Sequence, residues 1–141
     1  MSQIFKFRRI LLILCLVTSN LAMAVLHDEM IFNGKAKNTG KPCTLKVFSL
    51  TETATPFTVQ VEATIYDPNE STNEIFEFTV KKTNSTQGFN VFSGGMVGKD
   101  QLNIFAPQTS DRLTKPNKFS VKWLHGDHFH SEQCEGLTLN E

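Results

Sequence analysis

Apolar and polar residues alternate along two neighbouring segments in the middle of the chain. The first is "FTVQVEATIY", residues 57–66, and the second is "EIFEFTVKK", residues 74–82. A period of two residues places alternate side chains on opposite faces of a strand, so each segment predicts a β-strand with one solvated face. The turn-forming "DPNESTN" lies between them. Together the two segments predict a long hairpin.

Shorter apolar segments follow the same pattern elsewhere, and each is bounded by Gly, Pro, Asn, Ser or Asp. They predict strands at residues 31–37, 44–50, 88–92, 101–105, 119–125 and 128–133. No apolar pattern of helical period persists over three turns after the amino-terminal segment. The chain is therefore predicted to be all-β, with about eight short strands. An antiparallel barrel and a two-sheet sandwich both fit this pattern.

The first 24 residues have the pattern of a secretory signal peptide. A basic start precedes an apolar run at residues 10–17, and Ala22, Met23 and Ala24 follow as a small-x-small cleavage site. The apolar run is well short of the roughly 20 residues that a membrane-spanning helix needs. We therefore expect cleavage after Ala24, no membrane span, and one domain at residues 25–141 in a secreted or periplasmic location.

The predicted cleavage changes the cysteine count. Cys15 leaves with the signal peptide, and Cys43 and Cys134 remain in an oxidising compartment. We expect these two residues to form a disulfide that closes most of the domain into one loop. Two buried free thiols are the alternative.

The charge of the mature chain speaks against nucleic acid as a partner. Removing Lys6, Arg8 and Arg9 takes away basic residues and no acid, so the formal net charge falls from zero to about −3. Clustered Lys and Arg bind phosphates, and here Lys35, Lys37 and Lys41 come nearest to a cluster. We interpret them as a solvated edge.

The stretch "KWLHGDHFHSEQC", residues 122–134, carries three of the four histidines. A two-residue loop, Gly126 and Asp127, would place His125 opposite His128 and Trp123 opposite His130. All three imidazoles would then share one face, where they would form a three-histidine site for zinc or copper. Asp127 or Glu132 would serve as an oxygen ligand, or would accept a hydrogen bond from a ligating imidazole and orient it.

A three-residue loop, residues 125–127, shifts the pairing by one position. Trp123 then faces Phe129 on the inner side, and His128 and His130 join Lys122 on the solvated face. This register gives the more apolar core and removes the metal site. The histidines would then be a polar hairpin end, or a cluster that responds to pH as its imidazoles become protonated.

Two weaker metal and modification signals stand elsewhere. Cleavage after Ala24 would make His27 the third residue, in the arrangement of an amino-terminal site for copper or nickel. Two N-x-[ST] sequons, at Asn69 and Asn84, fall in predicted loops.

The "GGMVGKD" stretch at residues 94–100 lacks the spacing of a phosphate-binding loop, so it predicts a turn between strands.

These observations predict a function in binding, with no catalytic role. No nucleophile or cofactor motif is present, so we expect an exported binding domain for a protein, a cell-envelope component or a small apolar ligand. A zinc- or copper-binding protein that uses His125, His128 and His130 is the alternative, and an exported hydrolase is a distant third. A hollow interior would distinguish an apolar-ligand carrier from an interaction domain. The sequence does not indicate an oligomeric state.

Overall fold

The computed structural model describes residues 28–49, 58–108 and 113–141, which form eight β-strands. The predicted signal peptide at residues 1–24 and His27 lie outside these ranges. The strands are β1 (Asp28–Ala36), β2 (Pro42–Ser49), β3 (Thr58–Asp67), β4 (Thr72–Thr86), β5 (Phe89–Gly95), β6 (Gln101–Pro107), β7 (Lys118–His125) and β8 (His128–Leu139).

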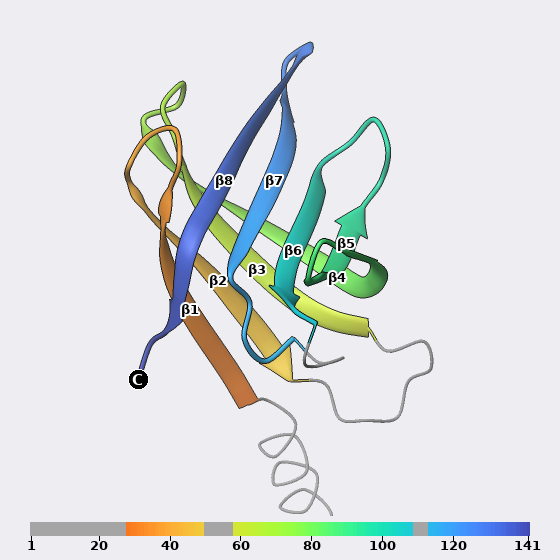
Figure 1. Cartoon of the computed structure of the whole chain (residues 1–141). Coiled ribbons are helices and arrows are strands. Elements are labelled where there is room, and N and C mark those ends of the chain that lie inside the picture. Colours follow the sequence, from red (N-terminus) through yellow and green to blue (C-terminus); the bar gives the residue numbers. More distant parts are fainter. Residues whose placement is uncertain (1–27, 50–57, 109–112) are drawn as a thin grey trace, which may run out of the picture.

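The strands form a closed antiparallel barrel in chain order (Figure 1). Each strand pairs with the next, and β1 pairs with β8 to close the sheet. The all-β prediction is thus confirmed, and of its two alternatives the barrel is correct. Every predicted strand is present. The main difference is length, because β4 and β8 continue well beyond the apolar residues that marked them in the sequence.

The interior of the barrel is filled with side chains. Alternate residues of β2, β3, β6 and β7 point inward, and Leu45, Ile65, Leu102, Ile104 and Phe119 are each 0% exposed. A ligand-sized cavity would leave accessible surface on the side chains that line it. These core residues have none, so the centre of the barrel is a packed core.

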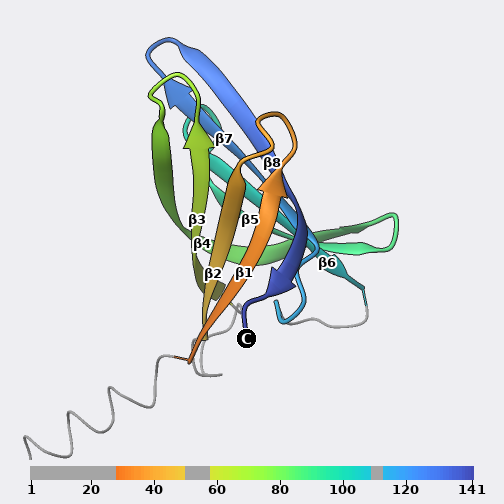
Figure 2. The same ribbon diagram turned by 90° about the vertical axis from the view of Figure 1, so that its left-hand side faces the viewer.

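Strand β4 changes partner halfway along its length. Its first part, residues 72–81, pairs with β3, whereas its second part, residues 81–86, pairs with β5. Figure 2 shows β4 running from the β3–β4 turn to the β4–β5 turn, which projects from the barrel. The sequon at Asn84 therefore lies in a strand, and its predicted loop position is wrong, because pairing with β5 extends the strand through polar residues. The sequon at Asn69 lies in the β3–β4 turn, as predicted.

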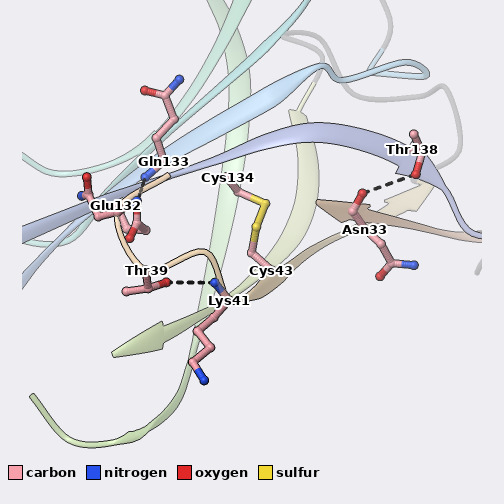
Figure 3. The surroundings of a disulfide bond; sticks show 9 residues. Asn33, Thr39, Lys41, Cys43, Glu132, Gln133, Cys134 and Thr138 are labelled. Carbon is pink, nitrogen blue, oxygen red and sulfur yellow. Dashed lines mark hydrogen bonds between the residues drawn. A yellow bond between two sulfur atoms is a disulfide. The ribbon is translucent and has the colours of Figure 1, made fainter. Parts of the chain in front are cut away.

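The predicted disulfide between Cys43 and Cys134 is present (Figure 3). It links β2 to β8 across β1, and both cysteines are buried. Gly34 of β1 lies between them: a Cβ atom there would be 2.9 Å from Cys134 Sγ and 2.6 Å from the carbonyl oxygen of Glu135. The cross-link thus needs glycine at this point. A disulfide is consistent with an oxidising, exported compartment.

The described ranges contain only strands and their connections, with no helix that is long and apolar enough to cross a membrane.

Candidate functional site at the hairpin end of the barrel

Four connections lie at one end of the barrel, because antiparallel neighbours alternate in direction. They are the turns at residues 37–41, 68–71, 96–100 and 126–127, and we call this the hairpin end. In Figure 1 the β7–β8 turn stands highest, with the β1–β2 and β3–β4 turns to its left and the β5–β6 turn to its right. The histidine stretch is part of this end.

The β7–β8 hairpin has the two-residue loop. His125 pairs with His128, and Trp123 pairs with His130. Gly126 has φ 61°, which suits the first position of a type II′ turn. The apolar-core argument for the three-residue loop is therefore wrong. Trp123 is buried inside the barrel, while Leu124 and Phe129 face outward as an exposed pair.

The three histidines share one face, but their rings have different neighbours. The rings of His125 and His130 lie 5.5 Å apart at an edge-on angle. His125 Nε2 lies 3.3 Å from Glu70 Oε1, and His130 Nδ1 lies 3.3 Å from Asn69 Nδ2. Among residues 28–49, 58–108 and 113–141, no three His, Cys, Asp or Glu side chains form a group that would hold a metal ion. Metal binding by these histidines stays a prediction.

The carboxylate of Asp67 joins the β3–β4 turn to the opposite side of the barrel. It is 1% exposed, and it accepts hydrogen bonds from the Asn69 backbone N–H at 2.9 Å and from Trp123 Nε1 at 3.4 Å. Burial alone raises the pKa of this carboxyl group. The hydrogen bonds from Asn69 and Trp123, together with nearby His125, outweigh burial, so the pKa of Asp67 lies below its ordinary value.

Two further acids tie the remaining turns to the same hairpin. Buried Glu132 of β8 accepts a hydrogen bond from the Asn38 backbone N–H of the β1–β2 turn at 3.0 Å. Asp100 of the β5–β6 turn accepts one from the Leu124 backbone N–H of β7 at 3.1 Å. With Asp67, one acid connects each of the other three turns to the β7–β8 hairpin. These acids position the hairpin end, which explains why an acidic residue is buried at Asp67 and at Glu132.

A hollow of about 550 Å³ opens between β4 and the β5–β6 turn. It is lined by Glu77 and Phe78 on β4, by Gly95, Met96, Lys99 and Asp100 near the β5–β6 turn, and by Leu124 on β7. It forms where β4 and β5 separate, since their pairing begins only at Lys81 and Ser93. The wall of the barrel therefore has a gap at the hairpin end.

Large apolar side chains are exposed in and beside this hollow. Met96 and Leu124 line it, Val97 follows Met96 in the β5–β6 turn, and Phe129 pairs with Leu124 across the β7–β8 hairpin. Met96 is 64% exposed, Val97 is 94%, Leu124 is 46% and Phe129 is 43%. We call these four residues the apolar rim. The sequence signal for it was weak, because single apolar residues in a glycine-rich turn or at a hairpin tip are common. Their proximity follows only from the barrel.

Acids outnumber bases along the adjoining part of β4. Glu77 lines the hollow and also a second groove of about 400 Å³ on the outer face of β2, β3 and β4, where it pairs in register with Glu62. Lys46 Nζ lies 3.7 Å from Glu62 Oε1, so Glu62 has an ion pair. Within the part of the chain that the structure describes, Glu77 has no ion pair. The outer edge of β4 is thus acidic.

Comparisons of the chain with protein-family models, with curated proteins and with solved structures found no match.

Proposed function

We propose that this protein is an exported, non-enzymatic binding domain that contacts a protein partner through the apolar rim and the hollow beside it. The observation that carries the proposal is the grouping of Met96, Val97, Leu124 and Phe129 at one end of the barrel. An exposed apolar group of this kind, bordered by polar residues, is typical of a protein interaction site.

The packed interior favours a protein partner over a small apolar ligand. A carrier needs an accessible cavity within the barrel, and the core side chains at its centre are buried against one another. The hollow at the rim is instead open to solvent and lies between two hairpins and a strand. A surface of this shape suits a protruding segment of another protein better than a small molecule.

The rim also sits on a firmly held support. Asp100 holds the β5–β6 turn against β7, and Asp67 holds the β3–β4 turn against Trp123. A backbone held by such contacts loses little freedom on binding, which lowers the entropic cost of association.

A photo-reactive amino acid placed at position 124 tests the proposal in the cells that make the protein. The matched control is position 139, because Leu139 is also an exposed leucine, at 51%, but lies at the opposite end of the barrel. We expect a discrete cross-linked protein from position 124 and none from position 139. Equal cross-linking from both positions would contradict the proposal.

Affinity for the cross-linked protein then separates a specific contact from proximity. We expect Leu124→Lys to weaken binding about tenfold or more, since a buried anchor at an interface contributes on that scale. Leu139→Lys is expected to bind as wild type does. Wild-type affinity in Leu124→Lys, measured by calorimetry, would remove the rim from the interface.

A further inference from the structure

We infer that the free edge of β4 at residues 72–78 binds an extended peptide strand that combines apolar with basic side chains. The inference rests on the proposed function and names the chemistry of the partner segment. It follows from the pairing of β4, whose residues 72–78 have β3 on one side and, in the described chain, no strand on the other.

The backbone of β4 supplies the binding groups. Alternate residues of a strand direct their N–H and C=O groups to opposite sides, so every second residue of this segment faces away from β3 and toward the gap. These groups form a template for one more antiparallel or parallel strand. The free segment has about seven residues, an ordinary strand length.

Gly94 marks the point at which this edge becomes free. A Cβ atom there would lie 2.7 Å from the carbonyl oxygen of Thr79 and 2.9 Å from Val80 Cγ1. Strand β5 thus still covers Thr79 and Val80 at Gly94, and the β5–β6 turn then diverges from β4. The free edge is therefore residues 72–78, and an added strand would start beside Gly94 and continue to the β3–β4 turn.

The side chains beside the edge determine which strand fits. Half-buried Phe76 and Phe78 offer apolar contacts on the inner face of β4, and the exposed Ile75 offers one on the outer face, which it shares with Glu77. The charged groups along the two grooves are Glu62, Glu77 and Asp100 against Lys99. Glu77 has no ion pair in the described residues, so a Lys or Arg of the incoming strand would be its complement.

The same charges disfavour a second copy of this chain as the occupant. Pairing two β4 edges would bring the acids Glu74 and Glu77 of one copy near those of the other. Like charges across paired strands are destabilising, and charged residues on edge strands oppose self-pairing. The partner is therefore a basic and apolar extended segment.

Selection from a display library of random peptides, about seven residues long, tests this inference with purified protein. We expect the selected peptides to carry Lys or Arg among alternating apolar residues. The affinity for a selected peptide, made by synthesis, should weaken about tenfold in Glu77→Lys. It should stay within about twofold of wild type in the control Glu135→Lys, because Glu135 is an exposed acid on β8. N-methylation of the peptide amides that face β4 should abolish binding. N-methylation of the other, alternate amides, which face away from β4, should leave the affinity unchanged.

Amide hydrogen exchange locates the bound peptide. We expect amide exchange in residues 72–78 to slow when the selected peptide is added. Three selection results would overturn the inference: no selected peptide, selected peptides that are acidic, or selected peptides that protect other strands. Protection of residues 72–78 by self-association in the absence of peptide would also overturn it. A partner cross-linked at position 124 that leaves β4 exchange unchanged would support the proposed function alone.

Discussion

Removing the disulfide through the double change Cys43→Ala and Cys134→Ala is expected to destabilise the domain strongly. The two cysteines are 91 residues apart in sequence. In the chain-entropy model a loop of that length lowers the entropy of the unfolded chain by about 15 cal/mol/K, which stabilises the fold by about 4.6 kcal/mol at 25 °C. Loss of the two buried sulfur atoms adds roughly 1 to 2 kcal/mol. The sum is comparable to the whole stability of many domains.

Urea unfolding of residues 25–141, followed by Trp123 fluorescence and circular dichroism, measures this loss. We compare the oxidised wild type, the reduced wild type and the double variant. Reduction removes the cross-link and retains the sulfur atoms, so it separates the two contributions. We expect most of the loss on reduction alone, with a higher m value, since the unfolded chain without the cross-link is more expanded. A loss below about 1 kcal/mol at unchanged m would refute the reasoning.

Two further changes test local features of the barrel. Asp67→Asn should lower the free energy of unfolding by about 1 kcal/mol near pH 7. Because the pKa of Asp67 is lowered by folding, its stabilisation is complete above the unfolded value near 3.8 and is lost as the pH falls through the lower folded value. The difference in unfolding free energy between wild type and variant should therefore shrink in denaturation curves as the pH falls below about 3.8, and a difference that grows toward acid would contradict the assignment. Gly34→Ala should destabilise by roughly 1 to 3 kcal/mol, because its Cβ would meet the Glu135 carbonyl oxygen and Cys134 Sγ. Thermal unfolding of Gly34→Ala, measured beside the control Lys37→Ala, checks this prediction. Equal melting temperatures of the two variants would show that β1 and β8 move apart without cost.

The strand pattern was predictable from the sequence because one face of each strand is buried. Alternation at Val59, Val61 and Ala63 requires a sheet with a solvated side, and the inward residues are the core that the structure shows. Closure into a barrel was not predictable. It depends on the pairing of β1 with β8, which are distant in sequence and joined by a register shift near Gly34.

The candidate site was only partly predictable. The glycine of the Gly126–Asp127 loop favoured the correct register, but the apolar pattern favoured the other, because Leu124 and Phe129 resemble core residues. They are exposed at the rim instead, and Trp123 reaches its polar partner Asp67 inside the barrel. The free edge of β4 had no signal in the sequence. It follows from a change of partner within one strand, which local patterning does not encode.

Residue-resolved amide hydrogen exchange of the free protein tests the account most directly, since the free β4 edge underlies the binding proposals. Strand β7 is the internal control, because residues 119–122 are paired with β6 and β8 on both sides. The account predicts alternation along residues 72–78, with protected amides that bond to β3 and fast-exchanging amides that face the gap. Uniform protection along residues 72–78, equal to that of β7, would contradict a free edge and the strand-binding role built on it.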